Sequence, residues 1–330
     1  MEHDACTNID LVLQAENALP PLVLERFSKL LSAEDYSATL RSFVSDKPIT
    51  FRPNTIRTTE EHVLHEIKTS GMESTPIPWC PLSHQLTIGT IRSLQSLPVS
   101  VEGGIYIQGA SSMLAAHALQ VTRDMRVLDI CAAPGSKTTQ IAIAMEQQGL
   151  LVANDISRKR LYRLREILKT QGVSNVEILC GRGERLGQSH ANCFDRVLVD
   201  APCSGDSRFR LDKPSRISKW SMREIQRLSK LQEQLLIAAL RCVVVDGLVV
   251  YSTCSFAPEE NEFVIDKVLS RNTIDAEVVQ MPTHLIPPSA REPIMSWDGR
   301  GFSQNVSSSM RIVPDKTASG FFIACIRRVS

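Results

Sequence analysis

Two cysteines stand where the sequence would place reactive thiols. Cys203 lies in "DAPCSG" (200–205), directly after the apolar run Val197–Val199, and Cys254 lies in "VVYSTCS" (249–255), at the end of a second apolar run. Each run is typical of a buried strand, and each cysteine follows where the chain turns polar. Ionised cysteines add to electron-poor carbon atoms, so this pair predicts nucleophilic chemistry. The alternative is that both are small hydrophobic residues of the core.

A second set of residues points to a nucleoside cofactor. The run "LDICAAPGSKTTQ" (128–140) passes from a predicted strand to a helix start through small residues, which let a ligand approach free backbone N–H groups. The next predicted strand ends at Asp155, whose carboxylate can accept hydrogen bonds from ribose hydroxyls. The G-x-G-x-x-G fingerprint of dinucleotide sites is absent, since only Gly135 is present. A cofactor without phosphates is therefore favoured, with a ligand-free tight turn as the alternative.

Apolar and amphipathic segments alternate from Arg126 onward. The predicted strands are 126–130, 151–155, 176–180, 195–200 and 247–255, followed by two more within 310–314 and 320–328. The predicted helices lie within 133–149, 157–172, 222–244 and 258–269. This alternation predicts an α/β fold, with a mostly parallel sheet covered by helices on both faces. If the fourth and fifth strands are neighbours, both thiols lie at one sheet edge, where such sheets bind their ligands.

The first part of the chain has a different pattern. Residues 1 to about 45 have helical spacing of leucines with a break at Pro20-Pro21, and residues 48–104 are irregular and rich in proline and glycine. We therefore expect an N-terminal helical and mixed α/β module over residues 1–102. The catalytic domain is expected over residues 103–330.

Composition limits the class of protein. The 330 residues are 43% hydrophobic and 22% charged, as in an ordinary soluble protein. The longest apolar stretch, 235–245, is interrupted by Arg241 and is too short to span a bilayer, and no signal peptide is visible. The nine cysteines include no CxxC pair. Neither a metal site nor a disulfide framework is indicated, and a cytoplasmic location is the simplest interpretation.

Positive charge is concentrated in one stretch. The net charge is only +1, but residues 205–230 hold eight lysines or arginines against the three acids Asp206, Asp212 and Glu224. Such a stretch is either a solvated surface or a binding surface for a polyanion.

The motifs resemble those of one family. "LDICAAPGSKTTQ", "VDAPCSGDS", "YSTCSFAPEENE" and "GFFIACIRR" look like the motifs of the Sun-family (RsmB/RsmF-like) RNA cytosine-5 methyltransferases, and the likeness extends from about residue 45 to the end of the chain. The resemblance implies a class I methyltransferase domain of Rossmann-like fold with S-adenosylmethionine as cofactor. It also implies RNA as partner, with rRNA or tRNA as the expected substrate and the 1–102 module as the expected RNA-recognition part.

The resemblance assigns roles to the candidate residues. Cys254 would be the nucleophile that adds to C6 of cytosine, Cys203 would assist release, and Asp200 would lie near both the transferred methyl group and the N3 side of the base. The implied cofactor-binding residues are Cys131, Ala132, Ala133, Pro134, Gly135, Ser136, Lys137, Asp155 and Asp200. The target carbon is inaccessible in a stacked helix, so the base must be unpaired or flipped out. The basic stretch 205–230 would hold RNA phosphates near the site.

The sequence departs from the family pattern after the third strand. An acid usually stands there to contact adenine, whereas this chain has Arg182 near that position and Glu184 as the nearest acid. Two alternatives stay open from the sequence. One is an RNA-binding or ribosome-assembly factor that keeps the fold without the chemistry, and the other is a DNA cytosine methyltransferase. Nothing in the sequence indicates an obligate protein partner.

Overall fold

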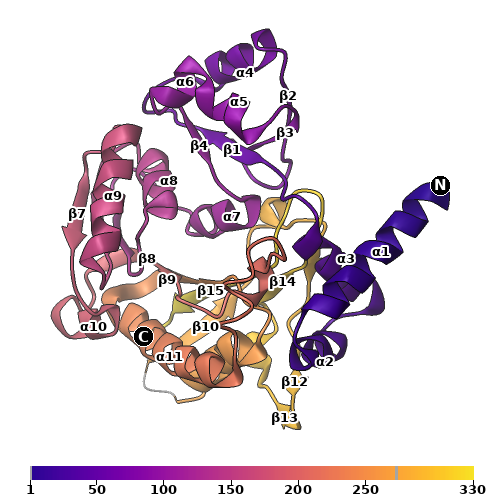
Figure 1. The fold of residues 1–330 in the computed structure, drawn as a ribbon. Helices are drawn as coiled ribbons and strands as arrows, with labels where there is room; N and C mark the ends of the chain where they lie inside the picture. The colour runs from indigo at the N-terminus through magenta and orange to yellow at the C-terminus, as the bar shows by residue number, and fades with distance from the viewer. Residues whose placement is uncertain (1, 272–273) are drawn as a thin grey trace.

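A central sheet organises the catalytic domain in the computed structural model, which describes residues 2–271 and 274–330, with side chains from residue 9 onward (Figure 1). Its strand order is β11-β14-β15-β9-β8-β5-β6-β7, and β10 also pairs with β15. Five of its strands are parallel: β5 (Arg126–Asp129), β6 (Leu150–Asn154), β7 (Val176–Leu179), β8 (Phe194–Asp200) and β9 (Val243–Thr253). These are the five strands predicted from apolar runs, and β8 and β9 are neighbours.

Antiparallel strands extend the sheet beyond β9. They are β15 (Phe321–Arg328), β14 (Met310–Ile312), β11 (Ala290–Arg291) and β10 (Ala276–Val279), while β12 (Ser296–Trp297) and β13 (Arg300–Gly301) form a separate hairpin. The two strands expected near the end of the chain are thus present. The short strands β10 to β13 were not predicted, because segments of two to four residues carry too little alternation to be recognised.

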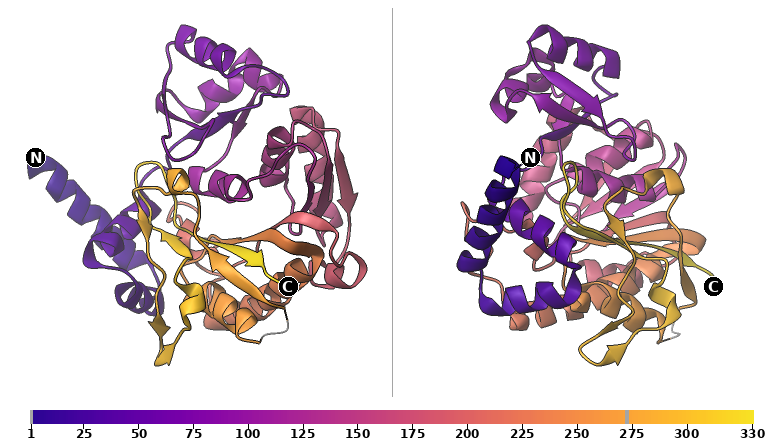
Figure 2. Two further views of the ribbon diagram at one scale, coloured as in Figure 1. Left: turned by 180° about the vertical axis from the view of Figure 1, so that it is seen from behind. Right: turned by 90° about the vertical axis from the view of Figure 1, so that its right-hand side faces the viewer.

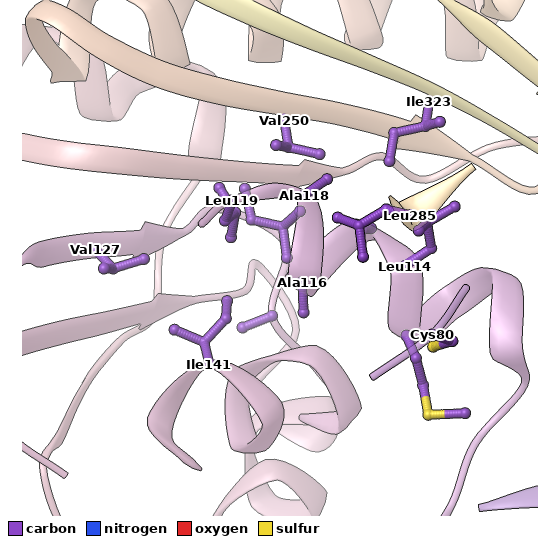
Figure 3. Packing of buried hydrophobic residues seen from close by; sticks show 14 of the residues in the cluster. Cys80, Leu114, Ala116, Ala118, Leu119, Val127, Ile141, Val250, Leu285 and Ile323 are labelled. Carbon is purple, nitrogen blue, oxygen red and sulfur yellow. The ribbon is translucent and has the colours of Figure 1, made fainter. Parts of the chain in front are cut away.

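Helices cover both faces of the sheet, as the alternating pattern predicts. Leu198 and Val250 face a cluster with α7 (Ala110–Ala118), α8 (Ser136–Ala144) and α9 (Arg158–Gln171), part of which Figure 3 shows. Their neighbours Val197 and Val249 face the opposite cluster, with α11 (Met222–Cys242) and α12 (Glu262–Leu269). Successive strand residues point to opposite faces, so a continuous apolar run is what a sheet buried on both sides requires.

The helix expected over residues 258–269 is divided. Pro258–Glu260 forms a 3₁₀ turn and α12 begins at Glu262, because Asn261 between them has the non-helical angles φ −117° and ψ −103°. The Asn261 side chain donates to the Ser255 carbonyl at 2.8 Å and accepts from the Thr253 hydroxyl at 2.6 Å. A polar side chain that bonds the chain before the helix thus takes Asn261 out of the helical conformation. A four-residue helix, α10 (Leu186–Ser189), lies between β7 and β8.

Three N-terminal helices pack on the catalytic domain. They are α1 (Glu2–Ala18), α2 (Pro21–Leu30) and α3 (Ala33–Val44), so the predicted break at Pro20-Pro21 is present and a second follows at Ser32, which caps α3. Phe27 lies edge-on to Phe256, and Phe43 lies edge-on to Phe209, with ring centroids 5.4 and 5.6 Å apart. Phe209 and Phe256 follow the two candidate thiols in the chain, so the N-terminal helices pack against the loops that carry both thiols.

A second N-terminal unit stands apart from these helices (Figure 2). It contains β1 (Thr50–Pro53), α4 (Glu60–Thr69), β2 (Glu73–Pro76), β3 (His84–Ile88), α5 (Ile91–Ser96), α6 (Pro98–Val101) and β4 (Ile105–Ile107), with the antiparallel order β2-β3-β1-β4. Its last strand lies beyond residue 102, so the small sheet reaches into the range expected for the catalytic domain. Arg52 joins the two parts, donating to the Ser136 carbonyl at 3.2 Å and to the Thr139 hydroxyl at 2.8 Å.

Candidate active site

The two thiols meet at the carboxyl edge of the sheet. Asp200 pairs in parallel register with Ser252, so the loops that follow β8 and β9 leave the sheet side by side. The Sγ atoms of Cys203 and Cys254 lie 3.2 Å apart, and the Cys254 backbone N–H donates to the Cys203 sulfur at 3.3 Å. This contact joins residues that are distant in sequence, and it depends on β8 and β9 being adjacent.

A buried carboxylate fixes the two loops to each other. Glu260 is fully buried and accepts hydrogen bonds from the Ser204 N–H (2.9 Å), the Ser255 hydroxyl (2.6 Å) and the Gln232 amide (3.0 Å), besides the Ser204 hydroxyl. Burial, with Asp206 nearby, raises the pKa of Glu260 to about 7. Each thiol is therefore next to a serine held by the same carboxylate, which keeps both sulfur atoms in place.

The two thiols have opposite acidities. The hydrogen bond from Cys203 and the nearby Arg208 guanidinium lower the pKa of Cys254 to about 6, against the effect of burial. That same hydrogen bond, together with burial, raises the pKa of Cys203 well above the usual value for a thiol. The contact between the two sulfur atoms therefore favours ionisation of Cys254 over ionisation of Cys203.

Arg208 is a site residue that sequence reasoning did not single out. It belonged to the basic stretch, but the Asp206–Arg208 3₁₀ turn brings it to the thiols. Ser207 in that turn donates to the carbonyls of Cys254 and Gly320, both at 2.7 Å. The only signal for Arg208 in the sequence is a cation five residues after the first cysteine. The turn that brings Arg208 close to the thiols depends on these tertiary contacts.

A cleft of about 990 Å³ opens beside the thiols. Its wall includes both cysteines and, of the residues predicted to bind a cofactor, Cys131, Asp155 and Asp200. The size matches a small-molecule site. The wall also contains Asn154, whose buried Oδ1 receives no hydrogen bond from the described residues, so a ligand donor such as an amino or hydroxyl group fits there.

The segment Ala132–Lys137 does not line this cleft. Gly135 has φ +116°, and the space where another residue would carry Cβ is occupied by Leu164 of α9. Packing against α9 and the positive φ therefore both require a glycine at this position. Lys137 Nζ lies 2.7 Å from Asp200 Oδ2, so its side chain holds the Asp200 carboxylate, which also accepts from the Ser252 hydroxyl at 3.1 Å.

The far end of the cleft is lined by ion pairs. Asp155 is buried and accepts from the Ser157 N–H at 2.9 Å, and its other oxygen pairs with Arg160 at 2.9 Å. Arg182 pairs with Glu184 at 2.6 Å, and both line the cleft, so the acid near the expected adenine position is Glu184 held by Arg182. The exposed Ile156 side chain also lines the cleft and adds an apolar surface.

The described residues contain no candidate metal cluster and no candidate membrane span. Within residues 9–271 and 274–330, no group of three or more His, Cys, Asp or Glu side chains is arranged to hold a metal ion. No helix in the same ranges has both the length and the apolar character needed to cross a bilayer.

The strand order and the cleft at the carboxyl ends of β5, β6 and β8 define a class I methyltransferase, whose cofactor is S-adenosylmethionine. Residues 116–327 match the family model "16S rRNA methyltransferase RsmB/F". The chain belongs to this family, the Sun-family RNA cytosine-5 methyltransferases. The predictions of fold class and family are thus confirmed.

Individual relatives differ in how much of their length is matched. The tRNA (cytosine(49)-C(5))-methyltransferase of Pyrococcus abyssi is 35% identical over 317 residues, which covers 93% of this chain and 95% of that protein. The ribosomal RNA small subunit methyltransferase F of Aeromonas salmonicida is 36% identical, covering 73% of this chain but 51% of that protein. A solved methyltransferase homologue from Pyrococcus horikoshii has a TM-score of 0.81 at 30% identity, covering 98% of this chain and 99% of that one.

Proposed function

We propose that this protein methylates C5 of a cytosine in RNA through a covalent bond between Cys254 and C6 of the base. The observation that supports this most directly is the thiol pair, with Sγ atoms 3.2 Å apart and the pKa of Cys254 lowered to about 6. C5 of cytosine is a weak nucleophile, and addition of a thiolate at C6 makes it an enamine carbon that can attack an electrophile. Bound S-adenosylmethionine supplies that electrophile as its sulfonium methyl group.

Asp200 and Cys203 have separate parts in this proposal. Asp200 lines the cleft beside the thiols. In this proposal it faces the N3 side of the base, where its carboxylate favours uptake of a proton by N3 from solvent as Cys254 adds, and that proton balances the negative charge brought by the thiolate. Once Cys254 is bonded to carbon, it no longer carries a thiolate charge. The hydrogen bond to that thiolate, which raised the pKa of Cys203, is then lost. Cys203 can then ionise and remove the C5 proton, after which Cys254 leaves as a thiolate.

The same observations weigh against the two alternatives. A binding factor without chemistry has no need for a thiolate beside a cleft of cofactor size. A DNA cytosine methyltransferase typically takes its nucleophile from a Pro-Cys motif, whereas the lowered pKa here belongs to Cys254 of the Thr-Cys motif. The basic stretch 205–230 supports a nucleic-acid substrate, which we take to be RNA.

Both rRNA and tRNA are candidates for the substrate class. We rank them by the share of each relative's length that this chain matches. The archaeal tRNA enzyme is matched over 95% of its length, whereas the Aeromonas rRNA enzyme is matched over 51%. We therefore place tRNA first. Incubation of separate unmodified tRNA and 16S rRNA transcripts with the protein, followed by bisulfite sequencing, checks this order. A modified cytosine found only in the rRNA would reverse it.

The covalent step is tested on a denaturing gel. Purified Cys203→Ala is incubated with total RNA and S-adenosylmethionine beside Cys254→Ala and the double variant. A slow, RNase-sensitive band is expected for Cys203→Ala alone, because the adduct forms and is not released. A band from Cys254→Ala instead would exchange the two roles. No band from any variant, with no methyl incorporation by the unmodified protein, would leave the non-catalytic alternative.

A further inference from the structure

A second cleft, of about 770 Å³, opens on the other side of Cys203. It shares Cys203, Arg208, Arg216 and Leu228 with the active-site cleft, so the two are continuous at the thiol loop. Nothing in the proposed chemistry uses this space, since the cofactor and the target base are both accounted for by the first cleft. We refer to it as the basic cleft.

The basic cleft has an excess of positive charge. Its wall holds five cations, Arg208, Arg210, Lys213, Arg216 and Lys219, and one acid, Glu224. Glu224 is paired with Arg227 at 2.6 Å, and Arg210 is paired with Asp212 at 2.8 Å. Within the part of the chain that the structure describes, the other four cations form no ion pair with a carboxylate. Repulsion among unpaired cations is offset when an anion binds between them.

One of these cations is held directly over the thiol loop. The guanidinium of Arg216 occupies the space beside Gly205 in which any other residue would carry its Cβ, and Gly205 has φ +67°. Gly205 therefore permits both the turn and the close approach of Arg216. A phosphate bound to Arg216 would lie next to the loop that carries Cys203.

An aromatic side chain completes the wall. Trp220 lines the basic cleft, and its inner part packs on the cluster that contains Phe27, Phe43 and Phe256. A rigid aromatic surface beside unpaired cations is the combination that binds single-stranded nucleic acid, where bases stack and phosphates pair.

We propose that the basic cleft holds the nucleotide adjacent to the target cytosine, with its base stacked on Trp220 and its phosphates on Arg216, Lys213 and Lys219. This inference rests on the proposed function. The target base must leave its stack for Cys254 to reach C6, and its neighbour then loses a stacking partner. Trp220 replaces that partner, so the cleft lowers the free-energy cost of presenting the cytosine.

Replacement of Trp220 tests the stacking contact. The measurement is kcat/KM for methyl transfer to an RNA that the unmodified protein methylates, and to the same RNA made abasic at the nucleotide on either side of the target. Trp220→Leu is expected to lower kcat/KM about 10-fold on intact RNA, and Trp220→Phe to restore most of it. For the unmodified protein, an abasic site at one of the two positions should lower kcat/KM as much as Trp220→Leu does on intact RNA. The same abasic site should cause no further loss of kcat/KM in the Trp220→Leu variant.

Replacement of the lysines tests the phosphate contacts without disturbing the core. Lys213→Gln/Lys219→Gln is expected to reduce the slope of log affinity against log salt by about 1.4, since each single-strand phosphate contact contributes about 0.7. Lys169→Gln, at an exposed position of α9 that does not line the basic cleft, is the control for loss of a surface charge. Cofactor affinity and melting temperature should be unchanged in the lysine variants.

The outcomes separate this inference from the proposed function. Suppose that the unmodified protein transfers methyl groups, and that the loss in kcat/KM from Trp220→Leu is the same on intact and on abasic RNA. Trp220 would then act only on folding, and the inference alone would be overturned. An unchanged salt slope in the lysine variant would overturn the phosphate contacts. Absence of methyl transfer to any RNA by the unmodified protein would overturn both the proposed function and the inference.

Discussion

The two ends of the active-site cleft are built differently. At the thiol end, the half-buried Cys203 and Cys254 are in contact with each other, and the neighbouring Ser204 and Ser255 are both hydrogen-bonded to the buried Glu260. At the cofactor end, the Arg160 and Arg182 side chains are about half exposed, at 48% and 55%, and pair across the surface of the cleft. Buried networks are costly to disturb, whereas exposed ion pairs contribute little. The proposed chemistry therefore depends on a buried hydrogen-bond network, whereas the proposed cofactor contacts lie beside exposed ion pairs.

The largest effect is expected from Glu260→Gln, which keeps the shape but cannot accept all of the bonds that join the thiol loops. Methyl transfer should fall roughly 100-fold, because buried donors lose their acceptor and the sulfur atoms shift. Glu177→Gln, at an exposed position of β7, is the control and should be neutral. Activity within a few-fold of the unmodified protein would show that the thiol end does not need this link.

Glu260 also makes stability depend on pH. Its pKa in the folded protein, about 7, lies above the usual 4.5, and the pKa values of Asp129 and Asp206 are raised to about 7 and 6, mainly by burial. The folded state binds these protons more tightly, so the stabilisation is complete below about pH 4 and is lost as pH rises through 6 to 7. Thermal melts from pH 5 to 8 should show a falling melting temperature, with a shallower fall in Glu260→Gln.

An intermediate effect is expected from Arg208→Gln. Loss of the cation should raise the pKa of Cys254 from about 6 toward the ordinary thiol value of about 8.5, so less thiolate is present at neutral pH. Methyl transfer at pH 7 should fall about 10-fold and recover at pH 9, while Arg208→Lys retains most activity. The pH dependence of iodoacetamide labelling of Cys254 should show the same rise in the pKa of Cys254 and requires no RNA. An unshifted labelling profile would remove Arg208 from thiol activation.

The smallest effect is expected from Arg182→Gln at the cofactor end. Its ion pair with Glu184 is exposed on the arginine side, and such pairs contribute at most about 1 kcal/mol. S-adenosylmethionine affinity, measured by calorimetry, should change less than about 3-fold. A loss of 10-fold or more would mean that Arg182 contacts the cofactor and that this end is as strictly organised as the thiol end.

The central strands and helices and the residues proposed to carry the chemistry could be predicted from the sequence alone. Runs such as Val197–Val199 are apolar throughout because both faces of their strand are covered, so the five parallel strands could be recognised. The positions of Cys203 and Cys254 after two such runs placed them at one sheet edge, and the motifs identified the family. Short strands such as β11 and the interruption at Asn261 could not be predicted, because they depend on partners far along the chain.

The contacts of each polar residue, and the difference in acidity between the two thiols, became visible only in the folded chain. The sequence grouped Lys137 with the cofactor-binding residues, and it gave no sign that the ammonium group of Lys137 pairs with Asp200. Arg208 was one cation among eight until a 3₁₀ turn brought it to Cys254, and Glu260 was one acid of a helix start until two loops enclosed it. Acidity and hydrogen bonding depend on distance and burial, which local sequence does not specify, whereas strand formation depends on local patterns, which it does.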